Sequence, residues 1–191
     1  MQKIGIFGGA FNPPHKGHVR LACDFADRLS LSKVLVIPSF IPPHKSAASL
    51  AGAEDRLAMC RLAFGGDERF VISSIEIDRK GKSYTYDTLK TIKEQNPDAA
   101  LYLIVGSDMF LSFGTWHRYK EILEICTLCT AARETEHSLA DNPYKAIVSD
   151  LPALHLNSTK LRAMLKNGED VKSYVGEKVA AYINDRGLYR D

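Results

Sequence analysis

The sequence predicts an α/β protein with a Rossmann-like, open and mainly parallel sheet, helices on both faces and a small C-terminal helical region. Apolar runs of strand length alternate with segments of helical spacing from the N-terminus onward, which is the pattern of βαβ units. The chain has 191 residues, of which 45% are hydrophobic and 25% charged, enough for one sizeable core. We expect a single domain over residues 1–191, with its helical part at about 158–191.

Short apolar runs bounded by polar or turn-forming residues predict the strands. Pro38 ends the second run, and the run at 101–105 is the clearest central strand because it is continuously apolar. Imperfect alternation of apolar and polar residues predicts the third strand. The predicted strands are Ile4–Phe7, Lys33–Ile37, Phe70–Ile77, Leu101–Val105, Cys126–Ala131, Ala146–Val148 and Ala153–Leu156.

Apolar residues at helical spacing predict the helices, with Pro97 following one helix end and Gly187 ending the last helix. The predicted helices are Val19–Leu29, Glu54–Phe64, Ser83–Gln95, Tyr119–Glu124, Ser158–Lys166 and Val175–Asp185. Prolines and small residues predict a loop at Ser39–Ala53, which we expect to act as a mobile lid. A further loop is predicted around Glu134–Pro143.

Composition excludes several classes of protein. The formal net charge of +2 is too small to indicate a nucleic-acid or membrane partner. The sequence has no apolar run long enough to span a bilayer and no signal-peptide pattern. We therefore expect a cytoplasmic protein without a nucleic-acid or membrane partner.

The pair Cys126 and Cys129 forms a C-x-x-C, which is compatible with a redox pair or half of a zinc site. The apolar flanking residues favour two buried thiols on a strand instead, and no second pair of ligands stands nearby. We expect neither a disulfide nor a metal site.

The segment GGAFNPPHKGH at 8–18 is the most informative part of the chain. It joins the first predicted strand to the first predicted helix, the place where open α/β sheets bind ligands. The helix start offers free N–H groups and a positive dipole end to an anion, and His15 and His18 point the same way across one turn. As hydrogen-bond donors they suit a phosphoryl group. A metal site and a purely structural use of the two rings are the weaker alternatives.

Three further positions have two interpretations each. Ser158 or Thr159 is an ordinary N-cap, or these residues and Arg162 form a second phosphate clamp at a helix start. Asp108 either caps the helix that follows or binds ribose hydroxyls. Trp116, the single tryptophan, either packs in the core or provides a platform for a flat ring.

H-x-G-H after a first strand, with S-T-x-x-R near the C-terminus, resembles the nucleotidyltransferase superfamily of adenylyltransferases. The segments IPPHK at 41–45, SYTYDTL at 83–89, VGSDM at 105–109 with Trp116, and GLY at 187–189 narrow the resemblance to the bacterial nicotinate-nucleotide adenylyltransferases. The resemblance covers essentially the whole chain. It implies that ATP and nicotinate mononucleotide, with Mg²⁺ carried by ATP, give deamido-NAD and pyrophosphate by direct attack on the α-phosphorus.

The resemblance also implies residue roles. His15, His18 and Arg162 are expected to be catalytic. ATP is expected to be bound by Gly8, Ala10, Phe11, His15, His18, Gly106, Asp108, Ser158, Thr159 and Arg162. Nicotinate mononucleotide is expected to be bound by Gly9, Asn12, Lys45, Thr85, Trp116 and His117, with the indole stacked on the pyridine ring. A homo-oligomer is compatible with the family.

Three positions depart from the family pattern. Thr and Asp are usual where this chain has Ala10 and Asn12, and some members have Tyr where it has His117. Two rival interpretations stay open, and the residues at Ala10 and Asn12 favour only the second of them. One is an enzyme like phosphopantetheine adenylyltransferase, although its usual T-x-G-H and shorter chain fit poorly. The other is a nucleotide-binding regulator without catalysis.

Overall fold

The computed structural model describes residues 1–42, 50–131, 142–151 and 156–190. Its strands are β1 (Lys3–Gly9), β2 (Lys33–Pro38), β3 (Phe70–Ile72), β4 (Ala100–Val105), β5 (Cys126–Ala131) and β6 (Ile147–Ser149). Its helices are α1 (Lys16–Arg28), α2 (Ala53–Phe64), α3 (Ile75–Arg79), α4 (Thr85–Gln95), α5 (Ser107–Leu111), η2 (Phe113–Thr115), α6 (Tyr119–Ile125), α7 (Ser158–Lys166), α8 (Lys172–Val175) and α9 (Glu177–Asp185).

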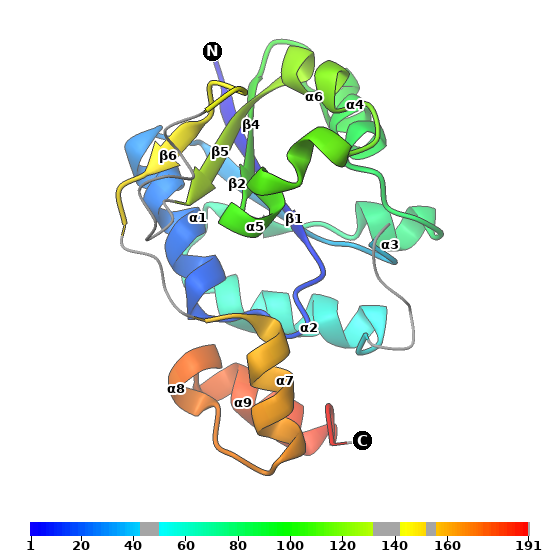
Figure 1. Ribbon diagram of the computed structural model, residues 1–191, viewed down its shortest axis with the longest axis vertical. Helices are drawn as coiled ribbons and strands as arrows, with labels where there is room; N and C mark the ends of the chain where they lie inside the picture. Colours follow the sequence, from blue (N-terminus) through cyan, green and yellow to red (C-terminus); the bar gives the residue numbers. More distant parts are fainter. Residues whose placement is uncertain (43–49, 132–141, 152–155, 191) are drawn as a thin grey trace.

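The described strands form one sheet in the order β3-β2-β1-β4-β5-β6, and every pair in it is parallel (Figure 1). The predicted open, mainly parallel α/β sheet is therefore confirmed. The central strand β1 pairs with β2 on one side and β4 on the other. Successive crossovers run outward from β1 to β3 and then return to β4. Loops that leave β1 and β4 thus diverge, which opens a crevice at their carboxyl ends.

Helices cover both faces of the sheet because its strands bury side chains on both sides. On one face, α1 and α2 pack over Phe7, with Phe25 and Phe64 fully buried between them. On the other face, α4, α5 and α6 pack over β4 through residues that include Leu89 and Ile122. The continuous apolar strand runs of the sequence reflect this two-sided burial.

The C-terminal helices α7, α8 and α9 form a separate group beside α2, at the end of the molecule opposite the N-terminus (Figure 1). They share an apolar cluster with α2 in which Met59, Leu161 and Val179 are almost completely buried. The predicted C-terminal helical region is present, although Gly176 at φ 88° divides its last helix into α8 and α9.

Two local predictions were wrong. The strand predicted at 70–77 ends at Ile72, and α3 begins at Ile75. The apolar–polar alternation of this segment also suits a short helix, whose first turn carries Glu76 and Asp78 near the positive end of the dipole. The short helices α5 and η2 were not predicted. The strand predicted at 153–156 and the loop at 134–143 lie largely outside the described residues.

Cys126 and Cys129 lie on β5, as predicted, and point to opposite faces of the sheet. They are three positions apart, and side chains alternate along a strand, so the two thiols cannot meet in a disulfide or on one metal ion. Among the helices in the described ranges, none is long and apolar enough to cross a membrane.

Candidate functional site

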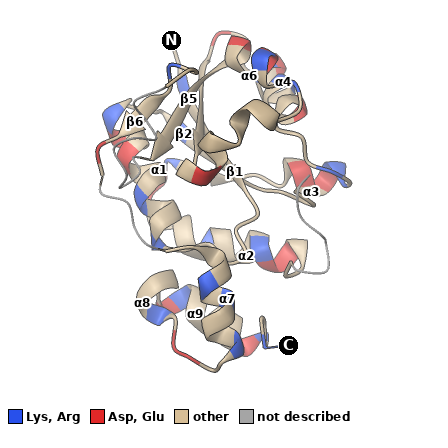
Figure 2. Ribbon diagram, viewed as in Figure 1, with Lys and Arg blue, Asp and Glu red and all other residues tan. Residues whose placement is uncertain are grey.

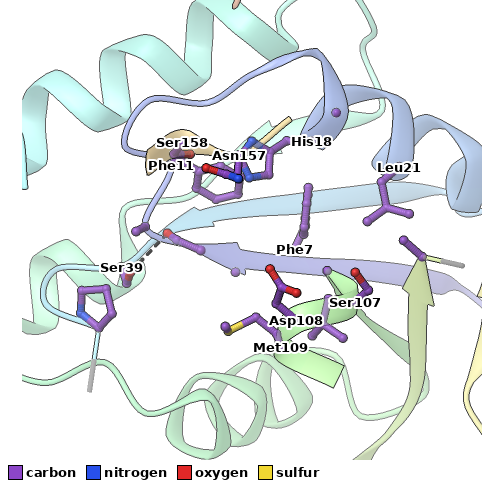
Figure 3. A pocket seen from close by; sticks show the side chains of 18 of the residues that line it. Phe7, Phe11, His18, Leu21, Ser39, Ser107, Asp108, Met109, Asn157 and Ser158 are labelled. Atoms are coloured by element: carbon purple, nitrogen blue, oxygen red, sulfur yellow. Dashed lines mark hydrogen bonds between the residues drawn. The ribbon is translucent and has the colours of Figure 1, made fainter. Parts of the chain in front are cut away.

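A cavity of about 790 Å³ opens at the carboxyl ends of β1 and β4. The turn after β1, the start of α4, the segment from α5 to His117 and the start of α7 line it. In Figure 3, His18, Phe11, Asn157 and Ser158 lie together on one side of β1, and Asp108 lies across the strand from them. The cavity therefore occupies the crevice that the strand order creates.

His15 and His18 form one unit at the start of α1. His15 is the N-cap residue, and its backbone N–H donates to Nδ1 of His18 at 3.1 Å. The two rings stack with centroids 3.6 Å apart and planes 26° apart. Because Nδ1 of His18 accepts a hydrogen bond, Nε2 is the ring nitrogen that carries the N–H. No acidic residue occupies the first turn of α1, so the helix dipole remains available to an anion.

Burial lowers the pKa of His15 from 6.5 to about 4. The side chain is 7% exposed, and the charged imidazolium would lose most of its hydration there. At neutral pH the ring is therefore uncharged. It can offer an N–H to a phosphate oxygen without bringing a positive charge.

The end of β1 leaves open space above Gly8. A Cβ placed on Gly8 would have no atom within 4 Å, and the same holds for Gly106 at the end of β4. Phe11 has a left-handed backbone, with φ 46°, and its buried ring packs edge-on against Phe7 at 5.4 Å. The contact between the two rings holds Phe11 in a left-handed backbone conformation, which is unfavourable for a residue other than glycine. Backbone strain of this kind is common at ligand sites.

The start of α7 reaches across to this turn. The Ser158 hydroxyl donates to the carbonyl of Pro13 at 2.9 Å, and the Arg162 guanidinium donates to the carbonyl of Asn12 at 2.9 Å. Arg162 also donates to the Thr159 hydroxyl. The two predicted anion-binding helix starts, at α1 and α7, are thus brought together.

Two capping interpretations were wrong. The N-cap of α7 is Asn157, whose side chain accepts from the backbone N–H of Lys160 at 2.8 Å, so Ser158 and Thr159 are not the cap. The N-cap of α5 is Gly106, so Asp108 is not a cap either. The hydroxyls and the carboxylate instead lie along the cavity.

The side of the cavity away from the histidines has aromatic walls. Trp116 is partly buried, packs on Phe113 with centroids 5.3 Å apart, and also lines the cavity. The His117 ring lies against Tyr84 at 4.8 Å. Thr85 begins α4 between these aromatic residues and the sheet.

Most of the predicted site residues meet at this one cavity. Those that line it are Gly8, Gly9, Ala10, Phe11, His15, His18, Thr85, Gly106, Asp108, Trp116, His117, Ser158 and Thr159. Asn12 is 1% exposed and does not line it, and neither does Arg162, which lies behind the turn. Lys45 lies outside the described residues.

Sequence reasoning missed Arg56, which is 1% exposed on α2. Its guanidinium donates to the carbonyls of Ala51, Ala10, Ser39 and Phe40 at 3.0, 2.9, 2.6 and 3.0 Å. It thereby joins the segments that follow β1 and β2. Arginine at a helical position gives no sequence signal for such burial, because it is normally a solvated residue.

Sequence reasoning also missed Glu76, a buried carboxyl that lines the cavity and accepts from the Thr88 hydroxyl at 2.7 Å. Burial raises its pKa. The prediction of a strand through this segment concealed it.

The described residues contain no group of three or more His, Cys, Asp or Glu side chains that could hold a metal ion. Basic and acidic residues are interspersed along the helices (Figure 2). The site offers side-chain donors and aromatic surfaces, and its lining includes the charged residue Arg20.

The family model described as cytidylyltransferase-like matches residues 6–165. A relative from Geobacillus thermodenitrificans, named "Probable nicotinate-nucleotide adenylyltransferase", is 40% identical over 99% of this chain and 87% of its own. Two structures of Plasmodium falciparum nicotinic acid mononucleotide adenylyltransferase share the fold. The one complexed with APC has a TM-score of 0.81 and 20% identity over 99% of this chain and 98% of its own. The one complexed with NaAD has a TM-score of 0.80 and 22% identity over the same shares of the two chains.

Proposed function

The chain belongs to the cytidylyltransferase-like family, and from this premise we propose that it is a nicotinate-nucleotide adenylyltransferase of NAD biosynthesis. It transfers the adenylyl group of ATP to nicotinate mononucleotide, which gives deamido-NAD and pyrophosphate. The full-length relative that bears this name supports the assignment. The observation that carries it is the meeting of two anion-binding helix starts, at His15–His18 and Ser158, over one cavity with an aromatic far side.

The phosphate of nicotinate mononucleotide attacks the α-phosphorus of ATP in line with the pyrophosphate leaving group. The new P–O bond forms as the α–β bridging P–O bond breaks, and the bridging oxygen leaves on pyrophosphate. Catalysis of this kind depends on positioning and on stabilising the charge of the transition state. His15 and His18 supply N–H donors for this, and the N-terminus of α1 supplies its dipole.

We assign the ATP side of the cavity to the turn after β1 and to the start of α7. Gly8 and Gly106 leave room for the nucleotide, and Asp108 faces a ribose. Ala10, Phe11, Ser158 and Thr159 complete this side. Arg162 acts through the turn, since its guanidinium is engaged with the Asn12 carbonyl.

We assign the nicotinate mononucleotide side to Gly9, Thr85, Trp116 and His117, with the indole stacked on the pyridine ring. We also assign Lys45, which lies outside the described residues, to the nicotinate mononucleotide side. Asn12 does not line the cavity, and its Oδ1 accepts hydrogen bonds from Ala51 and Tyr189, so this assignment gives it no substrate contact.

We propose that magnesium enters as part of the substrate, on the phosphates of ATP. The cavity suits this arrangement because its described carboxyl groups are limited to Asp108 and Glu76, and Glu76 is committed to Thr88. Mg²⁺ bound largely by phosphates and waters needs at most one or two carboxylates. When bound, it neutralises part of the charge on the triphosphate.

Purified protein should be incubated with Mg²⁺, ATP and either nicotinate mononucleotide, nicotinamide mononucleotide or phosphopantetheine, with pyrophosphate and product measured. We expect the highest kcat/KM with nicotinate mononucleotide. Product from phosphopantetheine alone would instead indicate phosphopantetheine adenylyltransferase. Tight ATP binding by calorimetry without turnover on any acceptor would indicate a nucleotide-binding regulator.

A further inference from the structure

The C-terminal segment Gly187–Tyr189 ends beneath the catalytic turn, 177 residues away in sequence. Gly187 ends α9 with φ 61°, and Leu188 N–H donates back to the carbonyl of Ile183 at 3.0 Å. Tyr189 follows with φ 65°, a left-handed conformation that is unfavourable for a tyrosine. This backbone delivers the Tyr189 hydroxyl to Oδ1 of Asn12 at 2.8 Å.

The same oxygen of Asn12 accepts a second hydrogen bond from the backbone N–H of Ala51 at 3.0 Å. A backbone N–H can only donate, so this contact fixes which end of the amide faces Ala51 and Tyr189. Asn12 is 1% exposed. A neutral amide accepts both bonds without placing a negative charge in that buried position.

The turn itself depends on such contacts, because residues 10–15 belong to no helix or strand. Three side chains donate hydrogen bonds to backbone carbonyls of the turn. Arg56 donates to the carbonyl of Ala10, Arg162 to the carbonyl of Asn12, and Ser158 to the carbonyl of Pro13. The Tyr189 hydroxyl, near the C-terminal end of the chain, holds the side chain of Asn12. The turn ends at His15, the N-cap residue of α1, whose backbone N–H donates to the ring of His18 and orients it.

We propose that Tyr189 is a positioning residue for adenylyl transfer: its hydroxyl holds Asn12 and thereby sets the placement of His15 and His18. The inference rests on the proposed function, and it adds the C-terminus to the machinery of the site. Loss of the hydroxyl lets the turn shift while leaving the other walls of the cavity in place. The chemical step, which depends on geometry to within about 1 Å, suffers more than substrate binding.

Tyr189→Phe tests this, with Tyr182→Phe as a matched control. Tyr182 lies on α9 and its hydroxyl donates to Asp55 of α2 at 2.9 Å, so the control removes a similar hydroxyl that does not touch the turn. We expect Tyr189→Phe to lower kcat about tenfold, with both KM values within about twofold of the wild type. Tyr182→Phe should keep the wild-type kcat.

Histidine-ring NMR of the same three proteins without substrate provides a readout independent of activity. We expect the His15 and His18 resonances to move in Tyr189→Phe and to stay in place in Tyr182→Phe. A wild-type kcat in Tyr189→Phe, an equal loss in the control, or unmoved resonances would overturn the proposal. If the wild type itself made no deamido-NAD, the proposed function would fail while the NMR comparison still decided the positioning role.

Discussion

The two histidines owe their arrangement to their sequence spacing and to the core below them. His18 lies three residues after His15, so a helix start places both on one side and lets the backbone of His15 donate to the ring of His18. The Phe11 ring packs edge-on against His18 at 5.1 Å and limits its movement. Two stacked rings in fixed positions are suited to stabilising charge without reorganisation.

His18→Ala should lower kcat by about 10², as the loss of one transition-state donor does. Lys16→Ala is the matched control, because Lys16 lies between the histidines in sequence but is exposed. Steady-state kinetics with both substrates saturating measures the effect. A rate near that of the wild type would remove His18 from the mechanism.

His15 should make stability depend on pH. Its pKa is about 4 in the folded state and 6.5 in the unfolded state, so the unfolded state binds more protons between these values. The wild type should therefore lose up to about 3 kcal/mol of unfolding free energy relative to His15→Asn as the pH falls from 7 to 4. Urea denaturation of both proteins across this range measures the difference. Parallel profiles would show that burial does not hold the ring neutral.

At the scale of elements, the site is made by helix starts and strand ends that the rest of the fold brings together. The loop after β2 is held from two sides: Arg56 of α2 binds its carbonyls, and the Ser83 hydroxyl accepts from the backbone N–H of Phe40 at 3.0 Å. Arg56 is thus a buried polar residue of α2 that faces the turn. The neighbouring Asp55 bonds to Tyr182 and Arg186, which belong to α9 and its C-cap.

Arg56→Met should reduce the unfolding free energy by about 3 kcal/mol or more, because four carbonyls lose a hydrogen-bond donor and a net bond contributes about 1 kcal/mol. Arg61→Met, at an exposed position of the same helix, is the control and should change it by less than about 0.5 kcal/mol. Urea denaturation measures both. Equal stabilities would show that the Arg56 contacts contribute nothing net.

At the scale of the whole molecule, the cavity has two chemically different sides. The histidines and the start of α7 line one side, and Trp116 with the start of α4 lines the other. This separation predicts that a change on one side affects one substrate.

Trp116→Ala should raise the KM for nicotinate mononucleotide far more than the KM for ATP. Loss of base–aromatic stacking costs about 1–3 kcal/mol, so an increase of roughly 10-fold to 100-fold is expected for the mononucleotide. Initial rates with each substrate varied in turn measure the split. Equal increases for both substrates would contradict stacking on the pyridine ring.

Local sequence determined the βαβ alternation, the turn at 8–18 and the helix start at 158, because strand runs, helical spacing and turn residues act over short distances. It could not reveal the short helix at 75–79, since apolar and polar residues alternate there in a way that suits both structures. Nor could it tell helix caps from ligand contacts at Ser158 and Asp108. That distinction depends on whether an earlier residue, Asn157 or Gly106, supplies the N-cap.

The sequence by itself therefore determined the α/β class, most of the elements and most of the residues that line the cavity. Only the tertiary structure decided that the Asn12 side chain is buried and that Arg162 stands behind the turn. It also decided that Arg56 is buried beneath the turn and that Tyr189 reaches it from the C-terminus. The physical reason is that each of these roles is a hydrogen bond between segments distant in sequence. Periodicity and local propensity carry no record of such contacts, which exist only once the sheet and the C-terminal helices have packed.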